Sequence, residues 1–257
     1  MSPFEVIILG VIEGFTEFLP VSSTGHLILA SHALKLAQSD FLKSFEIAIQ
    51  LGAILSVVVM YLKKFLLNFE VIKRVGIAFL PTAVIGFLLY GFIKNVLLES
   101  AATVLWSLFL GGIVLILFEL WHKNKEKSEE RSVSSLSYAH CFFIGFFQTI
   151  SIIPGVSRAG ATILGGLWLG MPRKTIVEFS FLLALPTMAG AAGLDLIKNI
   201  SNFSYDQFGI LAVGLVISFI TAVLAIKFLL SFIQKHTFIS FGVYRIILAI
   251  VFVMFLL

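Results

Sequence analysis

Long runs of apolar residues, separated by short polar stretches, make up most of the chain. A helix needs about 20 mainly apolar residues to cross the hydrocarbon core of a bilayer. We predict a membrane-spanning helix in each of six runs, at 45–62, 75–93, 102–121, 176–195, 208–226 and 241–257. The hydrophobic pattern therefore predicts an all-α integral membrane protein with six transmembrane helices.

Two further apolar segments are interrupted near their middle and predict re-entrant helical hairpins. In the first, "EGFTEFLPVSSTGHL" from Glu13, Pro20 breaks the helix and the hydroxyl residues after it can cap a new one. We expect one hairpin over 4–35 and a second over 138–170, with "IPGVSRAG" as its tip. Irregular backbone at that depth survives only inside protein or beside a wet cavity, so the two tips should meet near the midplane and mark a site.

The two hairpins open related halves of the chain. "GVIEGFTEFLPVSSTG" from Gly10 aligns without gaps with "GFFQTISIIPGVSRAG" from Gly145, and each motif is followed by three predicted spans. An odd number of crossings puts the second copy in the opposite orientation, which predicts an inverted-topology repeat. We expect a single membrane domain over 1–257, with repeat 1 at about 1–122, a linker at about 123–137 and repeat 2 at about 138–257. Chance similarity between two apolar, Gly/Ser-rich stretches is the alternative.

Composition and charge fix the class and suggest the orientation. Hydrophobic residues make up 59% of the chain, charged residues 12%, and the mean hydropathy is +1.07. Most basic residues gather in four predicted loops, which the positive-inside rule places in the cytoplasm, with both termini outside. These residues are Lys63, Lys64, Lys73, Arg74, Lys123, Lys125, Lys127, Arg131, Arg173, Lys174, Lys227 and Lys235. The loop at 123–131 carries both signs of charge, which favours a cytoplasmic linker and no nucleic-acid partner.

The first tip carries two carboxylates in an apolar setting. Glu13 and Glu17 are four residues apart, so they share one helix face and suit two oxygen ligands of a hard divalent cation. Ionised carboxylates are rare in lipid unless they face a cavity and meet a partner, which favours function over a pair of acids buried only in the core.

A basic and hydroxyl-rich set surrounds these acids if the tips meet. Arg158 supplies a permanent charge and a planar fork for phosphate oxygens, although a structural counter-ion role towards Glu13 or Glu17 is open. Hydroxyl groups that could donate to phosphate, or merely cap helices, belong to Ser22, Ser23, Thr24, Ser157 and Thr162. His26, one turn after Ser23, could act as acid or base or could be structural. Together these groups predict phosphoryl chemistry in a membrane, with a transporter or lipid flippase as the rival class.

The motifs also carry a family resemblance that covers essentially the whole chain. "EGFTEFLPVSSTGHL" and "PGVSRAGAT" resemble the two motifs of the bacitracin-resistance type undecaprenyl-diphosphatase family. The resemblance implies a multi-pass enzyme of the bacterial cytoplasmic (inner) membrane that hydrolyses undecaprenyl diphosphate to undecaprenyl phosphate and phosphate. That reaction recycles the lipid carrier for peptidoglycan synthesis, and bacitracin competes for the same diphosphate. The resemblance further implies a Mg²⁺ or Ca²⁺ cofactor and a site that opens to the periplasmic side.

The family motifs map onto named positions of this chain. They fall on Glu13, Glu17, Ser23, His26, Ser157, Arg158 and Thr162. Many members have a serine where this chain has Ala159, which puts in doubt only a hydroxyl at that position. We expect Glu13 and Glu17 to hold the cation and Arg158 to stabilise the transition state. Ser23 is the expected nucleophile with His26 as its acid or base; attack by a metal-bound water is the alternative. The oligomeric state is open, with a homodimer as one option.

Overall fold

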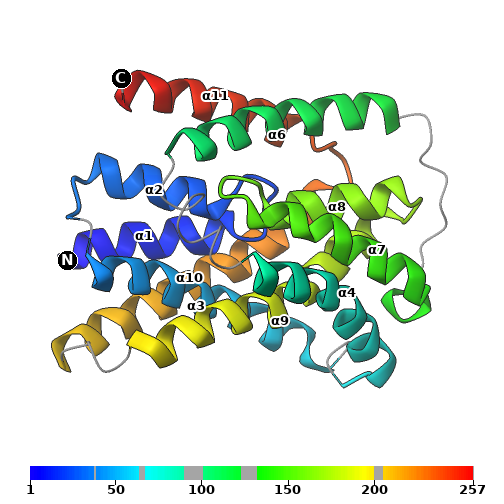
Figure 1. The fold of residues 1–257 in the computed structure, drawn as a ribbon, viewed down its shortest axis with the longest axis horizontal. Coiled ribbons are helices and arrows are strands. Elements are labelled where there is room, and N and C mark those ends of the chain that lie inside the picture. Colours follow the sequence, from blue (N-terminus) through cyan, green and yellow to red (C-terminus); the bar gives the residue numbers. More distant parts are fainter. Residues whose placement is uncertain (38, 64–66, 90–100, 123–131, 200–204, 257) are drawn as a thin grey trace.

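The computed structural model describes residues 1–37, 39–63, 67–89, 101–122, 132–199 and 205–256, and every regular element in these ranges is helical. The helices are α1 (Pro3–Thr16), α2 (Ser23–Ala33), α3 (Asp40–Tyr61), α4 (Phe69–Leu88), α6 (Ala101–His122), η3 (Val133–Ser135), α7 (Tyr138–Gln148), η4 (Thr149–Ile152), α8 (Arg158–Trp168), α9 (Arg173–Asn199), α10 (Tyr205–Phe232) and α11 (Ile239–Leu256). Figure 1 shows them side by side along one long direction, with both chain ends at the same end of the molecule.

Five helices in the described part of the chain are long and apolar enough to cross a membrane, which confirms the all-α membrane class. They lie on α3, α4, α6, α9 and α10, where five of the six spans were predicted. The sixth predicted span, 241–257, lies on α11, whose apolar stretch Ile239–Met254 is shorter. Residues 90–93 of the second predicted span and 123–131 of the predicted linker lie outside the described residues.

The predicted interruptions produce two helical hairpins. α1 begins at a capping box, in which the Ser2 side chain accepts a hydrogen bond from the Glu5 backbone N–H and the Glu5 carboxylate accepts one from the Ser2 backbone N–H. After α1 the chain turns at Pro20, and α2 begins behind Ser22, which has a left-handed φ of 71°. α7 and α8 form the second hairpin. Figure 1 shows the α1–α2 and α7–α8 hairpins entering from opposite ends, with their turns meeting at the centre of the molecule.

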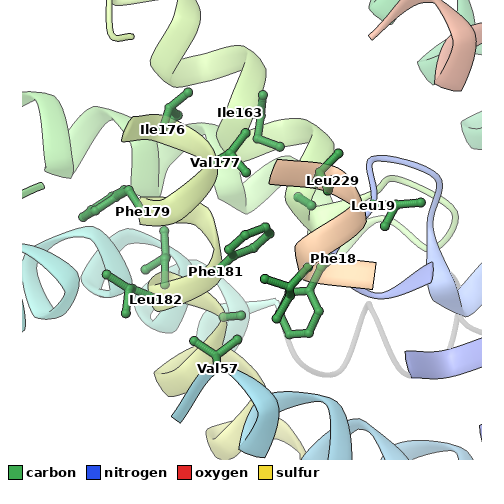
Figure 2. Close-up of a cluster of buried hydrophobic side chains, with 14 of the residues drawn as sticks. Phe18, Leu19, Val57, Ile163, Ile176, Val177, Phe179, Phe181, Leu182 and Leu229 are labelled. Carbon is green, nitrogen blue, oxygen red and sulfur yellow. The ribbon is translucent and has the colours of Figure 1, made fainter. Parts of the chain in front are cut away.

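Close packing holds the tip of each hairpin. In the second tip, Gly155 has φ +87°, a backbone conformation that favours glycine. A Cβ at this position would also lie 2.6 Å from the carbonyl oxygen of Val104 in α6, so there is no room for a larger residue. In the first tip, Phe18 is buried and meets Phe181 of α9 edge-to-face, with ring centroids 5.3 Å apart. Figure 2 shows Phe18 and Leu19 inserted among side chains of the surrounding helices. The turn between α1 and α2 is thus part of the core.

The packing partners of the two halves mirror each other. α1 packs on α10 and α7 packs on α4, while α3 packs on α9 and α6 packs on α11. Matching the helices of the two halves in order pairs α1 with α7, α2 with α8, α3 with α9, α4 with α10 and α6 with α11. Under this matching, the α1–α10 contact corresponds to the α7–α4 contact, and the α3–α9 and α6–α11 contacts each correspond to themselves. The aligned glycines follow the pattern: a Cβ at Gly10 would meet Gly214 of α10 at 3.1 Å, and one at Gly145 would meet Ala78 of α4 at 1.9 Å.

The α6–α11 pair lies along one side of the other helices (Figure 1). Close contact between glycines joins the pair, since a Cβ at Gly112 would lie 2.7 Å from the carbonyl oxygen of Gly242. At one end, Glu119 of α6 forms a bidentate ion pair with Arg173 of α9, at 2.5 and 3.0 Å. Between α6 and the α7–α8 hairpin lies a mostly apolar cavity of about 850 Å³.

Candidate active site

Glu17 lies where the two tips meet and joins residues from both. One carboxylate oxygen accepts a hydrogen bond from the Ser23 hydroxyl at 2.5 Å, and the other accepts from Arg158 Nη2 at 2.9 Å. Glu17 follows α1, Ser23 begins α2 and Arg158 begins α8. The carboxylate of the first tip is therefore the direct link between a hydroxyl on its own hairpin and the guanidinium of the other hairpin.

Glu13 lies one turn before Glu17 on α1 and is completely buried. Neither of its carboxylate oxygens makes a hydrogen bond of normal geometry. The like charges of Glu17 and of Glu46 in α3 act on it, and Arg158 supplies an opposing charge. A buried ionised carboxylate without donors is a costly arrangement.

Arg158 is held by Ser180, Glu17 and Met188, and one of its donors has no partner among the described residues. Its Nη1 donates to the carbonyl oxygen of Ser180 in α9 at 2.7 Å, and Nη2 pairs with Glu17. Its Nε is buried and makes no hydrogen bond in the described residues. The counter-ion geometry left open by the sequence is therefore present towards Glu17, while one donor of the planar fork is still available to an anion.

His26 is buried beside the same turn but faces a different partner. Its Nδ1 lies 2.7 Å from the carbonyl oxygen of Ser22, which can only accept, so Nδ1 carries a proton. In the neutral imidazole, the hydroxyl of Tyr244 in α11 then donates to Nε2 at 2.7 Å, and the two rings stack at 8°. Among the described residues, Ser23 donates to Glu17 and not to His26. A hydrogen bond between His26 and the Ser23 hydroxyl, which the expected acid–base role would use, is therefore not present in this arrangement.

The remaining predicted hydroxyls mostly act within the fold. Ser157 caps α8 by accepting from the Gly160 backbone at 3.0 Å, and it donates to the carbonyl oxygen of Leu19 in the other tip at 3.3 Å. Thr162 lies 2.6 Å from the hydroxyl of Ser180, close to the Arg158 contact, and donates to helix carbonyls. Ser22 is the buried residue before α2, and Thr24 is partly exposed in its first turn.

Three neighbours of the site were not predicted from the sequence: Ser180, Tyr244 and Arg245. Arg245 carries a visible signal, because a lone arginine in an apolar segment is rare and usually functional. Tyr244 and Ser180 carry none, because each is an ordinary residue of an apolar helix and meets the site only through packing.

A divalent cation fits the acidic side of the site. No three His, Cys, Asp or Glu side chains of the described residues are grouped so as to hold a metal ion. Glu13 nevertheless offers two buried oxygens without hydrogen-bond donors, one turn from Glu17. Carboxylate oxygens are the ligands that Mg²⁺ and Ca²⁺ prefer, and Mg²⁺ usually completes its shell with water and substrate phosphate.

The fold and site define a polytopic membrane protein in which paired acids, a hydroxyl and a guanidinium converge between two hairpin tips, as expected of a protein that handles a phosphorylated lipid. Residues 6–251 match the family described as "Bacitracin resistance protein BacA", and the chain belongs to this family. Similar proteins named "Undecaprenyl-diphosphatase" occur in Sulfurihydrogenibium sp. (52% identity, 98% of each chain), Wolinella succinogenes (50%, 100% of this chain and 99% of the relative) and Aquifex aeolicus (46%, 100% of each).

Proposed function

We propose that this protein is a membrane hydrolase that converts undecaprenyl diphosphate to undecaprenyl phosphate and inorganic phosphate. The reaction regenerates the lipid carrier for cell-wall synthesis and thereby supports resistance to bacitracin. Full-length relatives named as this phosphatase support the reaction and favour it over the flippase alternative. The observation that carries the proposal is the junction at Glu17, where Ser23 and Arg158 meet one carboxylate between the tips.

The junction suggests how the terminal phosphoryl group is transferred. The Ser23 oxygen attacks the terminal phosphorus while its proton passes to Glu17, which already accepts that hydrogen bond. The bond from phosphorus to the bridging oxygen breaks, and undecaprenyl phosphate leaves. Water then attacks the phosphorus of the phosphoserine, the bond between phosphorus and the Ser23 oxygen breaks, Glu17 returns its proton to that oxygen, and inorganic phosphate is released. Direct attack by water, with Ser23 only orienting the phosphate, is the second route.

Arg158 stabilises the charge that develops on the transferring group. Its Nε, which has no hydrogen-bond partner among the described residues, and its Nη2, which pairs with Glu17, are the donors that Arg158 would offer to the phosphate. Ser22, Thr24 and the backbone amides at the start of α2 add further donors beside Ser23. Ser157 and Thr162 act behind Arg158, through its helix cap and through Ser180.

His26 acts as the acid that protonates the leaving group, and not as the base that activates Ser23. Because Nδ1 is fixed by the Ser22 carbonyl, Nε2 is the nitrogen that exchanges protons, and Tyr244 supplies a hydroxyl to it. A protonated Nε2 donates to the bridging oxygen as the bond to phosphorus breaks.

A divalent cation, Mg²⁺ or Ca²⁺, is held by Glu13 and Glu17 in this proposal. When bound, it neutralises charge on the diphosphate oxygens. The unpartnered oxygens of Glu13 support this assignment.

The wider architecture follows the same proposal. The two hairpins are re-entrant, the halves form an inverted repeat and α11 is the sixth span, with the site opening to the periplasmic side of the cytoplasmic membrane. The mirrored packing of α1 on α10 and of α7 on α4 supports the repeat.

Phosphate release from farnesyl diphosphate by the purified protein tests the reaction. We expect Glu17→Gln and Ser23→Ala to lose about 100-fold or more in kcat. Ser56→Ala is the matched control, since Ser56 is also buried, in α3, and among the described residues it bonds only to its own helix; it should keep normal activity. Tight diphosphate binding without phosphate release above the Glu17→Gln background would overturn hydrolysis, and an active Ser23→Ala would assign the attack to water.

A further inference from the structure

Arg245 is a buried arginine in the middle of the apolar helix α11, only 2% exposed. All the hydrogen bonds of its guanidinium in the described part of the chain go to backbone carbonyls. Nε donates to Leu108 at 3.3 Å and Nη2 to Ser107 at 2.8 Å, both in α6. The other two bonds reach the hairpin tips: Nη1 donates to Pro20 at 3.3 Å and Nη2 to Gly155 at 3.1 Å.

These two carbonyls belong to the turns of different hairpins. Pro20 lies between Glu17 and Ser23 in the first turn, and Gly155 lies three residues before Arg158 in the second. Carbonyls in such turns lack the helical partners that satisfy other carbonyls, so buried ones need a donor from elsewhere. A single guanidinium supplies it to both. The planar fork thereby sets how the two turns lie relative to each other.

We infer that Arg245 is a positioning residue that holds the two tips in register, so that Ser23 and Glu17 of one tip face Arg158 of the other. The role rests on the proposed phosphatase reaction but involves no contact with substrate. It gives the last helix of the chain a part in catalysis through two carbonyl contacts. Because productive geometry is needed to within a fraction of an ångström, a small shift of one tip should slow the chemical step.

A matched pair of glycines on α6 separates this role from general packing. A Cβ at Gly111 would lie 2.2 Å from Arg245 Nη2. Gly111→Ala must therefore displace the guanidinium, although the arginine and its positive charge are retained. A Cβ at Gly112 would instead lie 2.7 Å from the Gly242 carbonyl oxygen and 2.8 Å from Ile246, and its contact with Arg245, at 3.3 Å, is with Cβ and not with the guanidinium. Gly112→Ala therefore disturbs the same helix pair without pushing on the guanidinium head.

The experiment measures kcat and KM for farnesyl diphosphate, together with hydrogen–deuterium exchange of the backbone, on the purified full chain. We expect Gly111→Ala to lower kcat about 10- to 100-fold with KM changed less than about threefold, and to raise exchange in both tips, near 18–24 and 153–160. Gly112→Ala should keep kcat and raise exchange only within α6 and α11. Arg245→Lys, a milder change with fewer fixed donors, should resemble Gly111→Ala.

Three results would overturn the inference. If Gly111→Ala and Arg245→Lys both match Gly112→Ala in kcat and in tip exchange, Arg245 is only a packing residue. A large rise in KM at unchanged kcat would make it a substrate ligand. Unchanged hydrogen–deuterium exchange in the tips of both variants would show that Arg245 does not hold the tips, whatever the activity. If the unaltered protein releases no phosphate, the proposed reaction fails, and tip exchange still decides whether Arg245 holds the tips.

Discussion

Replacing Arg158 by lysine separates the charge of this side chain from its shape. In the structure, the guanidinium reaches Ser180 with Nη1 and Glu17 with Nη2 and keeps Nε free. An ammonium can retain the ion pair with Glu17, but it cannot hold the same three directions in one plane. Loss of a preorganised donor to a developing negative charge costs about 3–4 kcal/mol, or roughly 100- to 1000-fold in kcat.

The lysine variant should fold almost normally, because the charge of Glu17 stays paired. Its melting temperature in detergent should lie within a few degrees of the unaltered protein. Arg158→Met would behave differently: the ion pair is nearly buried, at 10% and 7% side-chain exposure, and removing one partner of a buried pair costs about 3–5 kcal/mol. That variant should melt clearly earlier as well as lose activity.

The assay is phosphate release from farnesyl diphosphate, with thermal unfolding measured on the same preparations. Arg173→Lys is the matched control, since Arg173 also forms a buried ion pair, with Glu119, at the end of α6. It should alter stability while activity per folded molecule stays normal. A folded Arg158→Lys that retains nearly full kcat would refute the role of the planar fork and leave Arg158 as the counter-ion of Glu17.

Three further predictions address the metal, the histidine and the orientation. Chelation should abolish turnover, and Glu13→Gln should weaken the dependence on Mg²⁺ by an order of magnitude or more while the fold persists; a normal Mg²⁺ titration would place the ligands elsewhere. Tyr244→Phe removes the hydroxyl that reaches His26 and should lower kcat about tenfold with an altered pH profile; an unchanged profile would argue against a shared proton. A single cysteine at Ser128, with Cys141 replaced, should resist an impermeant maleimide in intact cells, and labelling without lysis would reverse the topology.

The hydrophobic pattern located the helices well because span length and chain breaking are local properties. Five predicted spans fall on α3, α4, α6, α9 and α10, since about 20 apolar residues with no water to bond their backbone form a helix wherever they occur. Pro20 ended the first hairpin helix for an equally local reason. The meeting of the tips followed from the aligned motifs and from the need to bury irregular backbone, and the Glu17–Arg158 contact bears out that expectation.

The partners of the site residues were decided only by the tertiary structure. His26 faces Tyr244, 218 residues away, and not Ser23, while Arg245 reaches carbonyls of both tips from the last helix. Sequence fixes which groups lie on one turn of a helix, but not which helix packs against it or how deeply. Those outcomes depend on close contacts such as that of Gly111 with Arg245 and on side-chain directions set by packing. The sequence alone therefore determined which chemical groups are present in the membrane, and the packing of distant helices decided which of them act on one another.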